Sequence, residues 1–159
     1  MKYTIRPIEP KDNNRVEYII RSCLIEFGGN HEGTAWMDPD LGRFSEVYAK
    51  PGRAYWVVEN EQGFVVGGSG IGELPGVPGT CELQKMYCLQ EVRGTGIPHE
   101  LIKICFDFAA KHYDKCYLET LESMVGAQRF YEKNGFKRVR DALAETGHDQ
   151  CDVRYIRDL

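Results

Sequence analysis

The spacing of apolar residues changes from a strand pattern to a helix pattern within the first 30 residues. Residues 3–8 alternate between apolar and polar side chains, which predicts a strand. Apolar residues between positions 16 and 27 then recur every three or four positions, which predicts a helix that ends at the glycine pair 28–29. A polar loop over residues 30–40 leads into a short helix predicted over residues 41–49. This loop either shapes a substrate pocket or serves as a plain connector.

Three further segments favour β structure. Residues 54–59 and 64–72 begin with β-branched and aromatic side chains, and the four residues between them suit a hairpin. A turn rich in proline and glycine separates the second segment from a third, over residues 81–89. We therefore predict a meander of three antiparallel strands.

The second half of the chain alternates helices with strands. Apolar residues follow one face of a helix over residues 97–113, and residues 116–121 then form a short strand. A strand reached through a helical crossover runs parallel to the strand before the helix. Ser123 is placed to cap the next helix, and residues 136–139 and 152–156 supply the last strands. The sum is a mixed α/β sheet with one central β-α-β step and no internal repeats.

Length and composition fit one globular domain over residues 1–159, since 42% of the side chains are apolar and 28% are charged. The formal net charge of −4 comes from interspersed charges, so we expect neither nucleic acid nor a membrane as a partner. Without a signal peptide or a long apolar run, the chain is expected in the cytoplasm. The oligomeric state stays open, a homodimer included.

The six cysteines form no C-x-x-C pair, and most of them lie in apolar segments. Free, buried thiols are therefore favoured over a disulfide framework. His148 and Cys151 resemble a pair of metal ligands, but zinc needs three or four ligands and no second pair lies at a suitable spacing. We predict no metal site.

A glycine-containing loop over residues 92–98 joins a predicted strand to the start of a long helix. Gly94 and Gly96 let several backbone N–H groups converge, and Arg93 adds a positive charge to that of the helix dipole. A diphosphate suits such a loop, although a simple tight turn is the alternative. The patterns G-x-x-x-x-G-K-[ST] and G-x-G-x-x-G do not occur, and the glycines of residues 67–72 are expected to let another backbone or a ligand approach a strand.

Two motifs resemble those of the GNAT N-acetyltransferase superfamily. The segment CELQKMYCLQEVRGTGIPHELI matches the family pattern R-G-x-G-[IL]-[GA] after a strand, and AQRFYEKNGF follows about 30 residues later as A-x-x-x-Y-E-K-x-G-F. The motifs occur in the family's order and spacing, and with the order of elements the resemblance covers nearly the whole chain. It implies an α/β fold with a twisted, mainly antiparallel sheet of about six or seven strands and helices on both faces.

The resemblance also implies acetyl-coenzyme A as the acetyl donor and a splayed strand that holds its pantetheine arm. The residues implied in cofactor binding are Met86, Tyr87, Cys88, Arg93, Gly94, Thr95, Gly96, Ile97, Pro98, His99, Met124 and Phe130. Three positions depart from the family pattern. Pro98 removes one backbone donor from the loop, Gln90 replaces a proline, and Met124 stands where many members carry an asparagine.

The resemblance assigns two catalytic side chains. Glu82 occupies the place of the general base, and Tyr131 that of the general acid that protonates the departing thiolate. The alternatives are a solvent-facing strand carboxylate for Glu82 and a core tyrosine with a satisfied hydroxyl for Tyr131. Cys88 as a nucleophile is less favoured than direct transfer.

The acceptor is expected to be a small-molecule primary amine of unknown identity. Candidate residues for its site are Glu26, Phe27, Asn30, His31, His148 and Arg154, each of which can equally be a solvated or structural residue. The alternative function is a module of the same fold that binds or senses an acyl-coenzyme A without turnover.

Overall fold

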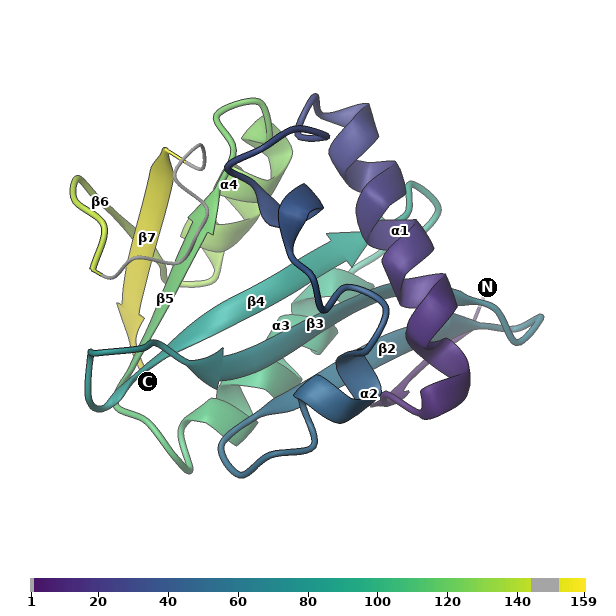
Figure 1. Ribbon diagram of the computed structural model, residues 1–159, viewed down its shortest axis with the longest axis horizontal. Helices are drawn as coiled ribbons and strands as arrows, with labels where there is room; N and C mark the ends of the chain where they lie inside the picture. Colours follow the sequence, from purple (N-terminus) through teal and green to yellow (C-terminus); the bar gives the residue numbers. More distant parts are fainter. Residues whose placement is uncertain (1, 144–151) are drawn as a thin grey trace.

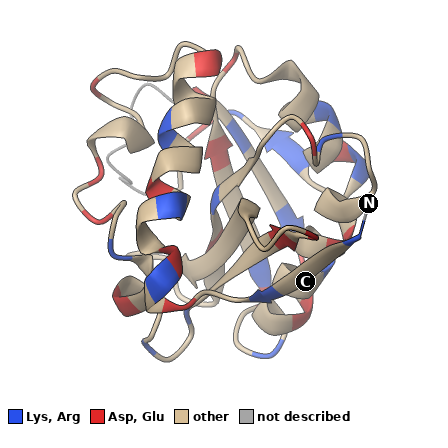
Figure 2. Cartoon of the chain, turned by 90° about the vertical axis from the view of Figure 1, so that its right-hand side faces the viewer, with Lys and Arg blue, Asp and Glu red and all other residues tan. Residues whose placement is uncertain are grey.

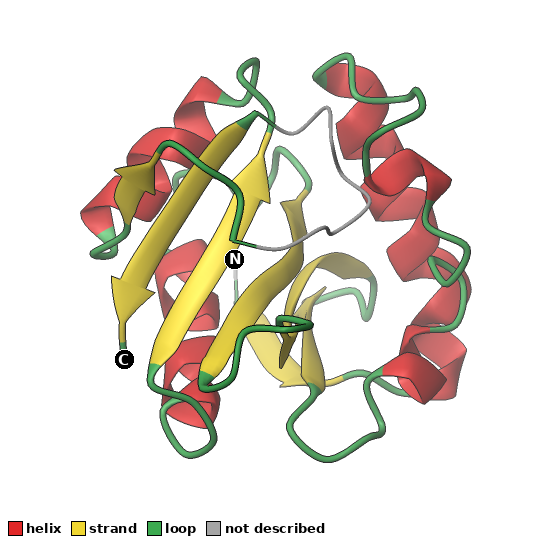
Figure 3. Cartoon of the chain, turned by 60° about the vertical axis from the view of Figure 1, so that its left-hand side comes forward, coloured by secondary structure: helices red, strands yellow, loops and turns green. Residues whose placement is uncertain are grey.

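The computed structural model describes residues 2–143 and 152–159, which form a seven-stranded sheet with helices on both faces (Figures 1 and 3). The strands are β1 (Tyr3–Pro7), β2 (Ala54–Asn60), β3 (Val65–Glu73), β4 (Thr80–Cys88), β5 (Lys115–Thr120), β6 (Lys137–Val139) and β7 (Val153–Asp158). The helices are α1 (Asn13–Glu26), α2 (Phe44–Val47), α3 (Ile97–Ala109) and α4 (Val125–Lys133), with 3-10 turns η1 (Pro10–Asp12) and η2 (Ala35–Met37).

The strand order is β1-β2-β3-β4-β5-β7-β6. Strands β4 and β5, which α3 connects, pair in parallel, and every other neighbouring pair is antiparallel. The predicted mixed, mainly antiparallel sheet with one β-α-β step is therefore confirmed.

Apolar side chains are buried on both faces of the sheet, and the two largest clusters contain the helices. Helices α1 and α2 bury their apolar side chains in one of them, and Ile20 and Phe44 are representative residues. Helices α3 and α4 contribute to the other, where Ile102 and Tyr131 pack with residues of β5 and β7. The amphipathic spacing of α1 and α3 therefore gives each helix one apolar face to turn toward the sheet.

Three local predictions were wrong in detail. Ser123 does not cap α4: its hydroxyl donates to the carbonyl of Phe27 at 2.7 Å, and Met124 holds the cap position. Helix α3 ends at Ala109 rather than at residue 113, because the chain turns there to reach β5. Helix α2 spans only four residues, starting where the amide of Ser45 donates to the Asn13 side chain.

The glycines of β3 provide space for side chains from other segments. A Cβ atom added to Gly68 or Gly70 would lie within 3 Å of the Tyr55 side chain. One added to Gly72 would lie within 3 Å of the Gln84 side chain. The predicted close approach to this strand is found, but side chains make the shortest contacts. The glycines thus let side chains lie flat against the sheet.

Acidic and basic residues are interspersed along the helices and strands, as Figure 2 shows. In the part of the chain that the structure describes, no helix has the length and apolar character needed to cross a membrane. The five described cysteines carry free thiols, while Cys151 and His148 lie outside the described residues. The described residues contain no group of three or more potential metal ligands.

Candidate active site

Strands β4 and β5 pair at one end and diverge at the other (Figure 1). Their pairing extends only from Thr80 to Glu82 on β4. Beyond that point β4 carries an irregularity: Lys85 has a φ of 52°, and the register with β3 shifts between Gly68 and Gly70. A bulge of this kind bends a strand and redirects its side chains. Here it accompanies the opening of a gap beside β5.

The irregularity at Lys85 is held by two contacts. The hydroxyl of Tyr55 donates to the Lys85 carbonyl at 2.8 Å. The Lys85 ammonium lies 2.6 Å from the carboxylate of Asp38, in the loop before α2, and its side chain is mostly buried. These contacts offset part of the strain of a left-handed lysine.

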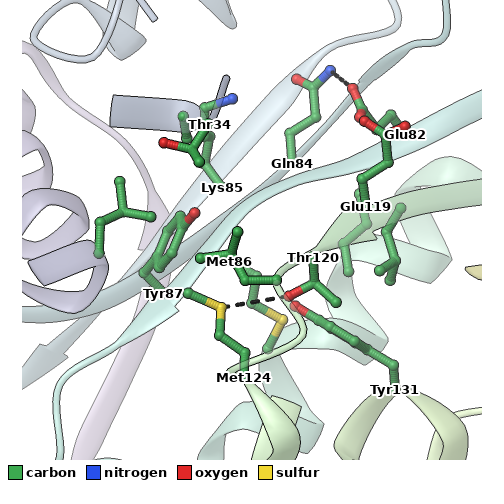
Figure 4. Close-up of a pocket in the computed structure, with 15 residues that line it drawn as sticks. Thr34, Glu82, Gln84, Lys85, Met86, Tyr87, Glu119, Thr120, Met124 and Tyr131 are labelled. Carbon is green, nitrogen blue, oxygen red and sulfur yellow. Dashed lines mark hydrogen bonds between the residues drawn. The ribbon is translucent and has the colours of Figure 1, made fainter. Parts of the chain in front are cut away.

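A small cavity, here called the splay cavity, lies where the two strands separate (Figure 4). Glu82 and Tyr131 both line it, together with Thr120 and Met124 from the β5 side. The Thr120 hydroxyl donates to the Met124 sulfur at 3.4 Å. Residues far apart in the sequence, including both predicted catalytic side chains, therefore meet at one opening.

Glu82 is buried, with 9% of its surface exposed. The amide nitrogen of Gln84 donates to its carboxylate at 2.8 Å, as the dashed line in Figure 4 shows. The alternative of a solvent-facing strand carboxylate is therefore wrong. A carboxylate at this depth requires hydrogen-bond partners, and Gln84 is one of them.

Tyr131 is 7% exposed and lines the splay cavity, with its ring against Phe136 and Tyr155. Tyr131 therefore belongs to the apolar core, as the alternative predicted, and it also lines the splay cavity, as the role of general acid requires. Burial, with a smaller contribution from nearby Cys88, raises the pKa of Tyr131 well above its usual value, so the phenol keeps its proton at neutral pH.

A second cavity of about 340 Å³, here called the cofactor cavity, adjoins the splay cavity. Met86, Tyr87, Met124 and Tyr131 line both. The predicted cofactor-binding residues on its wall are Met86, Tyr87, Cys88, Arg93, Gly94, Pro98, Met124 and Phe130. The structure thus brings most of that predicted set together around one mainly apolar space.

The glycine loop forms one end of the cofactor cavity. Gly94 and Gly96 have φ values of 75° and 88°, a conformation that glycine adopts at little cost. Neither amide donates to another group in the described part of the chain, and a Cβ atom at either residue would meet nothing within 4 Å. Open space and unpaired donors at the start of α3 are the features that an anion site needs.

Thr95 and His99 support this turn and do not line the cofactor cavity, whereas Pro98 does line it. The Thr95 hydroxyl donates to the Val92 carbonyl at 2.6 Å and accepts from the Ile97 amide at 3.3 Å. His99 packs against the Phe130 ring with 4.8 Å between ring centres. Pro98 lies in the first turn of α3, where a proline is well tolerated.

Arg93, which was predicted to add a positive charge to the loop, lines the cofactor cavity and pairs with a carboxylate. Its guanidinium contacts both carboxylate oxygens of Glu26 at 2.6 and 2.8 Å, and its Nε donates to the Cys88 carbonyl at 2.9 Å. It also lies 5.3 Å from the centre of the Phe27 ring. Arg93 therefore ties α1 to the loop, and Glu26 offsets its charge.

The Cys88 thiol lies on the wall of the cofactor cavity, but burial raises its pKa to about 12. A thiolate is the nucleophilic form of cysteine, and such a thiol is almost entirely protonated at neutral pH. This environment disfavours an acyl-cysteine intermediate.

The predicted acceptor residues do not gather in one place. Phe27 lines the cofactor cavity, and Glu26 pairs with Arg93. Asn30 and His31 are exposed and line none of the three cavities described here. Arg154 contacts the buried Glu119 at 3.8 Å. The fourth charged candidate, His148, lies outside the described residues.

A third cavity, also of about 340 Å³, lies on the α2 side of β4 and is here called the acidic cavity. Glu82, Gln84 and Lys85 line both this cavity and the splay cavity. Its other charged lining residues are Asp38, Asp40, Arg53 and Glu73. Arg53 pairs with Glu73, and Lys85 pairs with Asp38.

Sequence reasoning missed several residues of these walls. Cys23, Gly126 and Ala127 line the cofactor cavity, and Gln84 contacts Glu82. Of these residues, Gly126 could have been predicted from the sequence, because a glycine at the start of a helix leaves the first turn open to a ligand. A Cβ atom at this position would meet nothing within 4 Å.

The family model of the acetyltransferase (GNAT) domain matches residues 51–138. An Escherichia coli K12 protein described as the uncharacterized N-acetyltransferase YjgM is 40% identical over 158 residues, which cover 98% of this chain and 94% of the relative. An uncharacterized N-acetyltransferase of Schizosaccharomyces pombe is 28% identical over 129 residues, covering 80% of this chain and 78% of the relative.

Solved structures share the fold. A GNAT-family acetyltransferase from Staphylococcus aureus superposes with a TM-score of 0.88 at 23% identity, covering 99% of both chains. The PaiA N-acetyltransferase from Thermoplasma acidophilum, solved in complex with coenzyme A, superposes with a TM-score of 0.75 at 15% identity, covering 100% of both chains. Sequence, family match and architecture agree: this chain belongs to the GNAT acetyltransferase family and is an acyltransferase.

Proposed function

We propose that this enzyme transfers the acetyl group of acetyl-coenzyme A directly to a small primary amine. The observation that carries the proposal is the meeting of Glu82 and Tyr131 at the splay cavity, beside the cofactor cavity. A buried carboxylate and a protonated phenol at one opening supply the base and the acid that such a transfer needs.

The cofactor cavity suits acetyl-coenzyme A in shape and chemistry. The open amides of Gly94 and Gly96 suit the diphosphate, and the apolar wall formed by Met86, Phe130 and their neighbours suits the pantetheine arm. Beyond Glu82, β4 and β5 do not pair within the described residues, and an extended arm suits the space along this edge of β4. The donor, when bound, supplies a thioester whose acyl carbon accepts the amine.

Two proton transfers accompany the transfer. An ammonium with a pKa of about 10 must lose a proton before its nitrogen can attack, and the Glu82 carboxylate accepts that proton directly or through a water. The departing thiolate, whose conjugate thiol has a pKa of about 8.5, takes a proton from the Tyr131 hydroxyl. Tyr131 then recovers a proton from solvent. The N–C bond forms as the C–S bond breaks, with no cysteine intermediate.

The acceptor enters, in this proposal, through the acidic cavity. Glu82 lines this cavity as well as the splay cavity, and four carboxylates line the acidic cavity against two cationic side chains. A wall with an excess of negative charge attracts a protonated amine. Part of this wall comes from the loop over residues 30–40. This supports the alternative in which that loop shapes a substrate pocket rather than serving as a plain connector.

A thiol-release assay tests the proposal. The purified enzyme is incubated with acetyl-coenzyme A and a panel of primary amines that includes diamines, polyamines, amino acids and aminoglycosides. We expect release of coenzyme A above the amine-free rate for at least one cationic amine, with the N-acetylated product identified by mass spectrometry. Tight binding of acetyl-coenzyme A without turnover of any amine would instead favour the binding or sensing module.

A further inference from the structure

A chain of hydrogen bonds links the aromatic core under α2 to the carboxylate of Glu82. The hydroxyl of Tyr48 donates to the Gln84 amide oxygen at 2.7 Å, and the Gln84 amide nitrogen donates to Glu82 at 2.8 Å. Burial raises the pKa of Tyr48 well above its usual value, so its hydroxyl carries a proton to donate.

We propose that Tyr48 and Gln84 are positioning residues that hold the Glu82 carboxylate ionised and aimed into the splay cavity. The inference rests on the proposed function, in which Glu82 accepts the proton of the amine. Figure 4 shows Gln84 beside Glu82 on the same strand, with its nitrogen directed to the carboxylate.

The direction of the Gln84 amide follows from its two neighbours. A flipped amide would place its oxygen against an ionised Glu82, so that two acceptors would face each other. The orientation found pairs a donor with each acceptor, and the Tyr48 hydroxyl stabilises it at the far side. A hydrogen bond donated to a carboxylate favours the ionised form.

The glycines of β3 leave space for this chain. Gly72 lies directly opposite Glu82 in the β3–β4 register, and a Cβ atom there would lie 2.8 Å from the Gln84 amide oxygen and 3.0 Å from its nitrogen. Gly70 similarly faces the Tyr48 ring, at 2.9 Å from its Cε1 atom. A side chain at position 72 would push the flexible end of Gln84 aside, although Gln84 and Glu82 themselves would be unchanged.

Other charged and titratable groups face Glu82 and share its environment. Those lining the two adjoining cavities, or interacting electrostatically with it, are Asp38, Asp40, Tyr48, Arg53, Glu73, Lys85, Tyr87, Cys116, Glu119 and Tyr131. All of them are unchanged in the variants of Gln84 and Gly72 proposed below. A change in the Glu82 titration that both variants share therefore comes from the Gln84 amide.

Carbon-13 NMR of glutamate-labelled enzyme measures the titration midpoint of the Glu82 carboxyl, assigned by its loss in Glu82→Gln. In Gln84→Met the midpoint should rise by about one pH unit, the size expected when a carboxylate loses one charge-assisted hydrogen bond. Gly72→Ala should move it in the same direction, and Tyr48→Phe should move it less. Midpoints that stay in place in both Gln84→Met and Gly72→Ala would overturn the proposal.

Two controls match these changes. Gly42→Ala also displaces only the flexible end of a glutamate, Glu17, and Tyr113→Phe removes a hydroxyl that donates to the Gly52 carbonyl. Neither should move the Glu82 midpoint, and a shift in either control as large as that in Gly72→Ala would overturn the proposal.

The pH profile of kcat/KM, measured with the amine that the thiol-release screen selects, separates this inference from the proposed function. If Glu82 is the base, the acidic limb of the profile should follow the NMR midpoint upward in Gln84→Met. A moved midpoint with an unmoved profile would keep the hydrogen-bond chain and contradict Glu82 as the base.

Discussion

The cofactor cavity and the acidic cavity are both lined by the distorted strand β4, yet they are built in different ways. At the glycine-loop end of the cofactor cavity, the backbone amides of Gly94 and Gly96 come from one continuous loop. The acidic cavity is formed by side chains from α2, β3, β4 and the loops before α2 and β2, and some of its charged side chains pair with one another. A site made of backbone is encoded locally, whereas a site made of side chains depends on how distant segments pack.

The largest effect is expected at Tyr131, which lines both the splay cavity and the cofactor cavity. Replacing Tyr131 with Phe removes only the hydroxyl, so turnover should fall by roughly 100- to 10,000-fold, the usual contribution of a general acid. Acetyl-coenzyme A affinity, measured by calorimetry, should change little. Tyr155→Phe is the control, since that buried hydroxyl donates to Glu132 and lines none of the cavities. Unchanged turnover in Tyr131→Phe would remove this residue as the acid.

The next largest effect concerns the backbone-built end of the cofactor cavity. Gly96→Val places a β-branched side chain at a φ of 88° and in the open space of the loop, so acetyl-coenzyme A should bind about 100-fold more weakly, or about 2.7 kcal/mol. Gly76→Val is the matched control, because Gly76 has a φ of 78° and nothing within 4 Å but lies in a remote turn. Equal affinity in both variants would contradict the assignment of the loop to the diphosphate.

A smaller effect is expected at Glu26, the ion-pair partner of Arg93. Glu26→Gln removes the carboxylate that offsets the guanidinium charge, so the cofactor should bind roughly two- to fivefold more tightly, as befits a partly exposed ion pair. The gain should diminish at high salt. Weaker binding would show instead that the ion pair is needed to shape the loop.

The smallest effect is expected at Cys88. Because its thiol has a pKa of about 12, Cys88→Ala should change turnover by less than about threefold, or about 0.6 kcal/mol of barrier. Loss of most of the activity, or an acetylated Cys88 in the mass spectrum of the wild-type enzyme, would contradict direct transfer.

The same contrast between backbone and side chains explains what the sequence could predict. The order of elements follows from apolar spacing, and the glycine loop follows from a short motif before a helix. The Glu26–Arg93 pair joins residues 67 positions apart, and the Tyr48–Gln84 contact joins residues 36 positions apart, so no local pattern indicates either. Ser123 was misjudged for a similar reason, since the Phe27 carbonyl that it contacts is 96 positions away.

We propose that the space between the diverging strands and the glycine loop receives acetyl-coenzyme A. This can be measured by calorimetric titration of the purified enzyme with acetyl-coenzyme A, alongside coenzyme A without the acetyl group. We expect saturable binding of one molecule per chain at micromolar levels or tighter. The absence of binding would contradict the assignment of the cofactor cavity, and with it the proposed mechanism.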